Sequence, residues 1–328
     1  MLRIHKAYNY LFAGETTEDF VPALAYCPDP MHSWPTSTCV VDYSLSRIRK
    51  AAPGRWQCCE LEDLTGQYEN IYIHVRPFDA LLQVKRDIYA ASRLLLPTGE
   101  LRLRVPPKSG ATKIGSILAE VFGYLRVAKS GGFHLFSCQQ APPQEFLVED
   151  PSIYFHDTVS GRELRFAGRR GIFSADKIDR GTAFLLRIIP ALQGKSVIDV
   201  GCGYGAIGVV AAARGADVTL IDVDARAIKL ANHNMQLNGL VGTTFIEDQF
   251  GCFKSNMFDV ILSNPPTHAG SHMLRSLFSD MVRICKRNGY IALVVREHLN
   301  YEKWLRDFGR LSVRGILHGY KVLQVQKR

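Results

Sequence analysis

The chain has 328 residues, of which 47% are hydrophobic, 10% aromatic and 22% charged. This composition excludes a disordered or fibrous chain, and the length is sufficient for about two globular domains. Lys and Arg outnumber Asp and Glu by 40 to 31, and the resulting formal charge of +9 is weak evidence for an acidic partner such as nucleic acid.

The chain carries no visible targeting, membrane or metal signal. Its first residues, MLRIHKAYNYLFAGETTEDF, contain no apolar run of signal-peptide length, and no window approaches the roughly 18 apolar residues of a membrane helix. The eight cysteines form no Cys-x-x-Cys pair and have no zinc-like spacing to histidine. We therefore expect a soluble, cytoplasmic protein with free thiols and no metal site.

The N-terminal half repeats the pattern of the C-terminal half. Three segments, YENIYIHVRP, DIYAASRLLLPTGELRLRV and VFGYLRVAKSGGFHLFS, are similar to FDVILSNPP, DMVRICKRNGYIALVV and DFGRLSVRGILHGYKVLQV, which follow roughly 190 residues later in the same order. This predicts two domains of related topology, although any two strand and helix units share some likeness. The region STCVVDYSLSRIRKAAPGRWQCCELED holds one glycine, Gly54, so the first copy is expected to lack a cofactor site.

A polar segment with three prolines, QQAPPQEFLVEDPS, indicates a linker, and we place the domains at 1–148 and 149–328. The segment that follows, GRELRFAGRRGIFSADKIDRGTAFLLR, is rich in arginine around Phe166 and Phe173. It is either a solvated face or a surface that steers a phosphate-bearing substrate. Arg169, Arg170 and Phe173 are its candidate substrate contacts.

The second half alternates strands and helices. Strands are predicted in SVIDVGCG, ADVTLIDVD, TTFIED, FDVILSNPP, YIALVVRE and YKVLQVQK, and helices in AIGVVAAARG, ARAIKLANHNMQLNGL and HMLRSLFSDMVRICKRNG. Such alternation predicts an α/β fold with a mostly parallel sheet covered on both faces.

The loop GCGYGAIG, at 201–208, follows a strand and opens a helix, as expected of a nucleotide-like ligand site. Gly203, Gly205 and Gly208 satisfy the dinucleotide pattern, and Asp222 follows at the distance of a ribose-binding acid. An NAD-dependent dehydrogenase is therefore allowed. Asp199 before the loop favours S-adenosylmethionine instead, because that ligand carries an ammonium group that NAD lacks.

Four motifs, VIDVGCGYGAIG, TLIDVD, FIEDQF and SNPP, resemble those of class I S-adenosylmethionine-dependent methyltransferases. With GIFSADKIDRGTAFLL, SNPPTHAG and LHGYKVLQVQK, the chain is similar to the guanine-N2 methyltransferases of ribosomal RNA. The resemblance implies a Rossmann-like seven-stranded methyltransferase sheet, preceded by a degenerate methyltransferase-like α/β domain. It also implies S-adenosyl-L-methionine as cofactor and ribosomal or other structured RNA as substrate. The sequence does not give the oligomeric state, and we favour a monomer.

The resemblance also assigns residues. The cofactor would be bound by Asp179, Thr182, Asp199, Gly201, Cys202, Gly203, Gly205, Asp222, Asp248 and Gln249, with Asp179 and Thr182 at its methionine end. Catalysis would rest on Asn264, Pro265 and Pro266, and Thr267 and His268 would contact the substrate. Phe173, Arg169 and Arg170 are further candidate substrate contacts, which come from the arginine-rich segment and not from the resemblance. For the aspartates, helix capping or turn formation is the alternative.

An exocyclic base amine is a weak nucleophile because its lone pair is delocalised into the ring. The side-chain oxygen of Asn264 and the carbonyl of Pro265 would accept its two N–H bonds and aim the lone pair at the methyl group. Thr267 stands where the family usually has an aromatic residue, so Phe173 or Tyr204 would supply the stacking surface. The acceptor could also be a small molecule or a protein glutamine, and a catalytically inactive RNA-binding protein is a further alternative.

Overall fold

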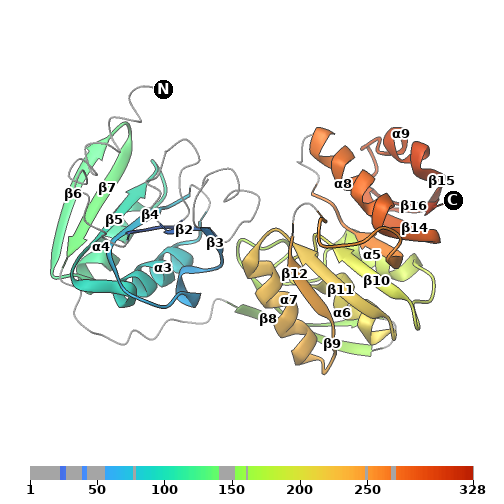
Figure 1. Cartoon of the computed structure of the whole chain (residues 1–328), viewed down its shortest axis with the longest axis horizontal. Coiled ribbons are helices and arrows are strands. Elements are labelled where there is room, and N and C mark those ends of the chain that lie inside the picture. The colour runs from blue at the N-terminus through green and yellow to red at the C-terminus, as the bar shows by residue number, and fades with distance from the viewer. Residues whose placement is uncertain are drawn as a thin grey trace. The chain divides into compact units, whose positions relative to one another are not determined.

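The structure is a computed structural model that describes residues 23–26, 39–42, 56–76, 79–139, 152–159, 162–247, 250–266 and 271–327. Asp248, Gln249, Thr267 and His268 lie outside the described residues. The chain divides into two compact units, Met1–Pro151 and Ser152–Arg328. We describe each unit by itself (Figure 1).

Unit 1 is built on a sheet with strand order β3-β2-β1-β4-β5-β7-β6. The strands are β1 (Ala23–Tyr26), β2 (Cys39–Asp42), β3 (Trp56–Cys58), β4 (Tyr68–His74), β5 (Leu95–Val105), β6 (Tyr124–Ser130) and β7 (Phe133–Gln139). A short 3-10 turn, η1 (Leu61–Asp63), and two helices, α3 (Leu81–Leu94) and α4 (Ala111–Val121), complete the described part of this unit.

Unit 2 begins with an antiparallel hairpin of β8 (Ser152–Val159) and β9 (Arg162–Arg169). Its main sheet has strand order β12-β11-β10-β13-β14-β16-β15. The strands are β10 (Ser196–Val200), β11 (Asp217–Asp222), β12 (Thr243–Ile246), β13 (Phe258–Ser263), β14 (Cys285–Arg296), β15 (Gly309–Leu317) and β16 (Tyr320–Lys327). The helical elements are α5 (Arg180–Ile188), α6 (Ala206–Ala213), α7 (Ala225–Leu237), α8 (Ser271–Ile284), α9 (Glu302–Leu305) and η2 (Arg306–Phe308).

The two main sheets have the same topology, which confirms the related folds expected from the sequence. When the strands of each main sheet are numbered along the chain, both orders read third, second, first, fourth, fifth, seventh and sixth strand. The counterpart of β10 is therefore β1, one strand earlier than the region STCVVDYSLSRIRKAAPGRWQCCELED that the sequence comparison assigned. The sequence after β1, CPDPMHSWPTST, contains no glycine at all, so the correction leaves the first copy without a glycine loop.

Two further details differ from the sequence prediction. The β8–β9 hairpin and β15 were not expected as strands. Helix α8 ends at Ile284 and does not continue to Gly289, because the loop before β13 uses its last carbonyls. Asn256 N donates to Arg283 O at 3.0 Å, Met257 N donates to Ile284 O at 2.7 Å, and Cys285 already pairs with Phe258.

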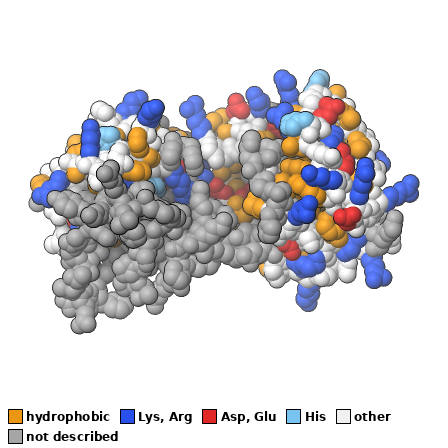
Figure 2. All heavy atoms as spheres, turned by 90° about the horizontal axis from the view of Figure 1, so that it is seen from above, with side chains coloured by type: hydrophobic (Ala, Val, Ile, Leu, Met, Phe, Trp, Pro, Cys, Tyr) orange, Lys and Arg blue, Asp and Glu red, His pale blue; other side chains and the backbone are white. Residues whose placement is uncertain are grey.

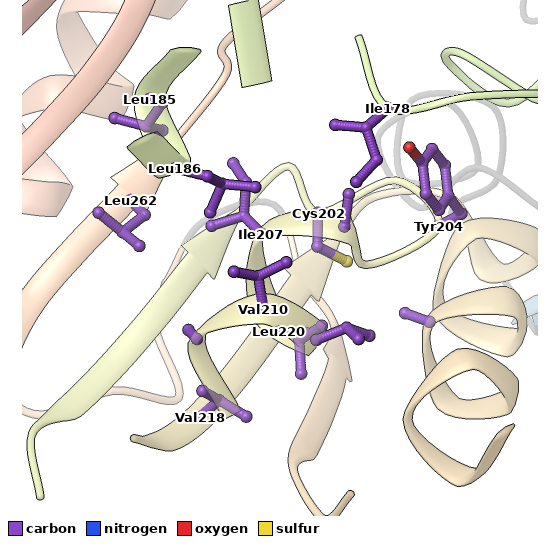
Figure 3. Packing of buried hydrophobic residues seen from close by; sticks show 14 of the residues in the cluster. Ile178, Leu185, Leu186, Cys202, Tyr204, Ile207, Val210, Val218, Leu220 and Leu262 are labelled. Atoms are coloured by element: carbon purple, nitrogen blue, oxygen red, sulfur yellow. The ribbon is translucent and has the colours of Figure 1, made fainter. Parts of the chain in front are cut away.

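Strand alternation in β10 places Asp199 on the face that carries the glycine loop's helix. Val197 packs with α5, α6 and α7 on that face, whereas Ile198 and Val200 pack with the α8 side. Helix α6, AIGVVAAA, is apolar on every side, as expected of a helix enclosed in a core. Figure 3 shows Ile207 and Val210 of this helix among Leu186, Val218 and Leu220.

Gly208 lets α6 lie directly on β11, and we expect Gly208→Ala to destabilise unit 2. A Cβ at this position would lie 2.3 Å from Leu220 Cδ2, and Leu220 is fully buried. Overpacking of this kind costs about 1–3 kcal/mol. Urea denaturation would measure the loss, with Gly251→Ala as control, because a Cβ there meets nothing within 4 Å. Equal unfolding free energies for the two variants would contradict this packing.

Candidate functional site

The glycine loop between β10 and α6 is hydrogen-bonded to the end of β11 and is open on the side of Gly201. Gly201 N and Cys202 N donate to Ile221 O at 2.9 and 3.0 Å, and Gly203 N donates to Asp222 Oδ2 at 2.9 Å. Gly201 and Gly203 have φ of 69° and 55°, in the left-handed region that favours glycine. A Cβ on Gly201 would meet nothing within 4 Å, so a ligand can reach this main chain.

Asp222 ends β11, and its carboxylate holds both the glycine loop and the turn before α7. Its Oδ2 accepts from Gly203 N, and its Oδ1 accepts from Asp224 N at 2.9 Å. Burial raises the pKa of Asp222 above its ordinary value, and these backbone hydrogen bonds oppose that effect. Each carboxylate oxygen can accept a second hydrogen bond, so turn formation leaves room for a ribose hydroxyl. Asp224 caps α7 through Arg226 N and forms an ion pair with the Arg226 side chain.

Asp199 is 1% exposed and lies under the loop. Its Oδ2 accepts from Gly208 N at 2.9 Å, which ties β10 to the first turn of α6. Its Oδ1 is buried and has no hydrogen-bond partner among the described residues. Burial raises the pKa of Asp199 to about 7, with Asp222 adding to the effect. This carboxylate needs a cationic or donor group that the described chain does not supply.

The segment between β9 and α5 passes beside the loop. Tyr204 OH donates to Lys177 O at 3.1 Å, and Figure 3 shows Ile178 next to Tyr204 and Cys202. Tyr204 is 3% exposed and its ring packs edge-on against Phe155 and Phe166, so the expectation that it could stack on a substrate is wrong. Cys202 is likewise buried, and burial raises its pKa well above the ordinary value.

Phe173, in this same segment, is 63% exposed, so a planar ligand can reach its ring. The two arginines expected to act beside it differ from each other. Arg170 is exposed, whereas Arg169 is 6% exposed, which corrects the expectation that both reach an RNA backbone. Figure 2 shows many Lys and Arg side chains on the face turned to the viewer, and few Asp and Glu.

Asn264 directly follows β13 and comes close to the glycine loop through strand pairing. Val200 pairs with Ser263, so the loop and Asn264 leave neighbouring strands at the same edge of the sheet. Asn264 Nδ2 donates to Thr182 Oγ1 at 3.0 Å and to Asp179 Oδ2 at 3.3 Å. The structure thus brings Asp179 and Thr182 to Asn264. Pro265 is buried, and Pro266 is exposed.

Tyr320, the first residue of β16, belongs to this group of side chains but was given no role by the sequence. Its hydroxyl donates to Asp179 Oδ1 at 3.3 Å. Gly181 offered a signal, because a glycine in the first turn of a helix has a conformational cost that packing must offset. A Cβ on Gly181 would lie 2.7 Å from the Tyr320 ring.

The site and fold define a Rossmann-like methyltransferase. Residues 163–324 match the family described as methyltransferase small domain. A ribosomal RNA small subunit methyltransferase C from Haemophilus influenzae (strain 86-028NP) is 31% identical over 328 residues, covering 97% of this chain and 94% of that protein. The chain belongs to the ribosomal RNA small subunit methyltransferase C family of S-adenosylmethionine-dependent enzymes. The methyltransferase class indicated by the motifs is confirmed, and the dehydrogenase alternative is set aside.

Two other comparisons differ in extent. The protein of the same name from Chromohalobacter salexigens is 34% identical over 173 residues, so this match spans 50% of the chain and 52% of that relative. The T. thermophilus 16S rRNA N2 G1207 methyltransferase (RsmC), solved with AdoMet and guanosine, has a TM-score of 0.78 at 23% identity. That likeness covers 96% of this chain and 90% of the other, and it shows that the fold extends over both units.

Proposed function

We propose that this protein transfers a methyl group from S-adenosyl-L-methionine to the exocyclic N2 amine of guanine in ribosomal RNA of the small subunit. The observation that carries the proposal is the orientation of the Asn264 side-chain amide. Its NH2 group donates to Asp179 and Thr182 at the start of α5, so its oxygen remains available to accept a hydrogen bond from the amine that is methylated. Asn264 follows β13 at the edge of the sheet where the glycine loop begins. The names of the relatives and the guanosine in the T. thermophilus structure support the same substrate.

The residues at the loop fit this cofactor. Open space above Gly201 admits a ligand to the main chain, and the buried, unpartnered Oδ1 of Asp199 suits its ammonium group. Asp222 would hold the ribose hydroxyls with its remaining lone pairs. When bound, the cofactor supplies an electrophilic methyl group on a sulfonium centre. Asp248 and Gln249 remain proposed adenine contacts.

Asn264 and Pro265 would orient the acceptor amine. Asn264 Oδ1 and the Pro265 carbonyl each accept one N–H bond, which leaves the nitrogen lone pair facing the methyl group. Fixed placement of these groups lowers the activation barrier for methyl transfer, because they need no reorganisation during the reaction. The fixed φ of the two prolines keeps the carbonyl in place beyond the strand end. No strong base is required, since the amine becomes acidic as the new bond forms.

Phe173 is the residue we propose to stack on the guanine, since it is exposed and follows Ile172, whose Cγ2 lies 4.0 Å from a Cβ built on Gly203 of the loop. Stacking of an aromatic side chain on a base contributes roughly 1–3 kcal/mol. Arg170 would contact the phosphate backbone, and Thr267 and His268 remain proposed substrate contacts. Residues 1–148 would form the degenerate domain that helps to hold RNA, and residues 149–328 the catalytic domain. A ribosomal RNA substrate places the reaction in the cytoplasm, and we propose a monomer.

No helix in the described ranges is both long and apolar enough to cross a membrane.

The affinity for S-adenosylmethionine is expected to fall as the pH drops below about 7. The pKa of Asp199 is raised to about 7 in the free protein, and a bound ammonium group would lower it. Binding therefore releases a proton at lower pH, and affinity falls by up to about tenfold per pH unit. Asp199→Asn should weaken cofactor binding at pH 8, and binding to this variant at lower pH should release one proton fewer than binding to the wild type.

Calorimetry in buffers of different ionisation enthalpy measures this proton release. The slope that remains in Asp199→Asn is assigned to Asp222, whose pKa is also raised. A variant that releases as many protons as the wild type would exclude Asp199 from contact with the ammonium group.

The substrate class is tested by incubating the protein with labelled methyl donor and three acceptors, namely unmodified ribosomal RNA, a small-molecule extract and a protein extract. Label is expected in RNA. Transfer to small molecules or to protein glutamine, without transfer to RNA, would favour the second candidate function, in which Asn264 and Pro265 orient a different planar amide or amine.

A further inference from the structure

The side-chain amide of Asn264 is held in one orientation by two acceptors. Both of its N–H bonds have partners, Thr182 Oγ1 at 3.0 Å and Asp179 Oδ2 at 3.3 Å. A carboxylate oxygen only accepts hydrogen bonds, so the NH2 group and not the oxygen must face Asp179. A flipped amide would bring two acceptor oxygens together. The orientation leaves Oδ1 of Asn264 with no donor among the described residues.

Asp179 is itself fixed from two sides. As the cap of α5, its Oδ2 accepts from Gly181 N at 2.9 Å and Thr182 N at 3.2 Å. On the other side, its Oδ1 accepts from Tyr320 OH at 3.3 Å. The Arg296 guanidinium lies over the Tyr320 ring, 4.3 Å from its centroid. The start of α5, the end of β13 and the start of β16 are therefore joined by one chain of hydrogen bonds.

The contact between Tyr320 and Asp179 requires glycine at position 181, because a larger residue there would collide with the Tyr320 ring. An added Cβ would lie 2.7 Å from Tyr320 Cδ1 and Cε1 and 3.0 Å from Asp179 Oδ2. Tyr320 is 8% exposed, so its ring has little room to move aside. A glycine inside the first helical turn is less favourable than alanine by about 1 kcal/mol, and close approach of the Tyr320 ring accounts for it.

We infer that Asp179, Thr182 and Tyr320 are positioning residues, which fix the amide of Asn264 so that its Oδ1 faces the acceptor amine. The inference rests on the proposed function for the identity of that amine. It assigns Asp179 and Thr182 to the acceptor side of the site, whereas the family resemblance places them at the methionine end of the cofactor. The two assignments predict opposite effects of substitution.

Thr182 gives the cleanest test, because Val has nearly the same shape and Ser keeps the hydroxyl. Thr182→Val should lower kcat on RNA by about 10- to 100-fold, since misplacement of a reacting group by about 1 Å can cost about 100-fold in rate. Its dissociation constant for S-adenosylmethionine should stay within about threefold of wild type, and Thr182→Ser should restore most of the rate. Tyr320→Phe, acting from β16 through Asp179, should lower kcat in the same sense but by less.

A tenfold weaker cofactor affinity in Thr182→Val, with kcat preserved at saturating cofactor, would overturn the inference in favour of a cofactor contact. The orientation can also be observed in the free protein by NMR of ¹⁵N-asparagine label. The signal of the Asn264 side chain is identified by its absence in Asn264→Ala. Its amide protons should exchange slowly with solvent in wild type and Thr182→Ser, and faster in Thr182→Val.

The NMR result separates this inference from the proposed function. If RNA is not methylated but exchange still depends on Thr182, the orientation holds and the assigned acceptor is wrong. If exchange is the same in Thr182→Val and Thr182→Ser, the amide is not held as described and the inference fails, whatever the acceptor.

Discussion

Replacing Asn264 with alanine is expected to lower kcat for RNA methylation by about 10³-fold while cofactor affinity changes only a few-fold. In the proposed mechanism this side chain provides one of two hydrogen-bond acceptors for the amine, and it lies beyond the end of β13, where it contacts Asp179 and Thr182. In the alanine variant, water replaces the Asn264 amide beside Asp179 and Thr182, and the glycine loop is unchanged. Single-turnover rates with saturating cofactor, together with calorimetry, measure the two quantities.

Asn264→Asp is the matched variant for this prediction. It keeps the shape and an acceptor oxygen but brings a carboxylate against Asp179, so like charges disfavour the productive orientation. We expect a loss intermediate between wild type and alanine. Collapse of cofactor affinity in Asn264→Ala would show that Asn264 acts on the cofactor and would contradict the division of roles.

Replacing Asp222 with alanine is expected to weaken S-adenosylmethionine binding by at least about 100-fold, the scale expected when a hydrogen-bonding acid is lost from a buried site. The effect has two sources. The ribose hydroxyls lose the acceptor that we propose for them, and Gly203 N and Asp224 N lose the carboxylate that shapes the loop and the following turn. Calorimetry of cofactor binding measures the loss.

Asp224→Asn serves as the control for Asp222→Ala. It keeps the cap on α7, since Asn caps helices about as well as Asp, and removes only the ion pair with Arg226. Cofactor affinity should change less than about threefold, because the backbone N–H of residue 224 still donates to Asp222 Oδ1 in this variant. Equal losses in both variants would mean that the whole turn, and not Asp222, determines binding.

The parallel sheet and glycine loop could be predicted because local patterns determine them. Apolar runs alternating with helical periodicity specify β10 to β14, and glycines at 201, 203 and 205 occupy backbone angles that other residues avoid. The shared topology of the units was visible because the paired segments repeat in the same order. The assignment of β1 failed because its four residues, Ala23–Tyr26, give too short a run to distinguish.

The contacts around Asn264 could not be predicted, because they join residues far apart in the chain. Asp179, Asn264 and Tyr320 come from three separate elements, and no periodicity reports that α5 begins beside the end of β13. Burial was missed for a similar reason. The sequence suggested an exposed cation at Arg169 and a stacking ring at Tyr204, but both side chains are buried, and Tyr204 packs against Phe155 and Phe166.

Mass analysis of nucleosides tests the central claim most directly. Small-subunit ribosomal RNA that lacks its methyl groups is incubated with the protein and S-adenosylmethionine, digested to nucleosides and compared with a reaction containing Asn264→Ala. We predict N2-methylguanosine in the wild-type reaction and none above background with the variant. A methyl group on another atom or base, or unmodified RNA beside a protein that binds the cofactor, would contradict the account.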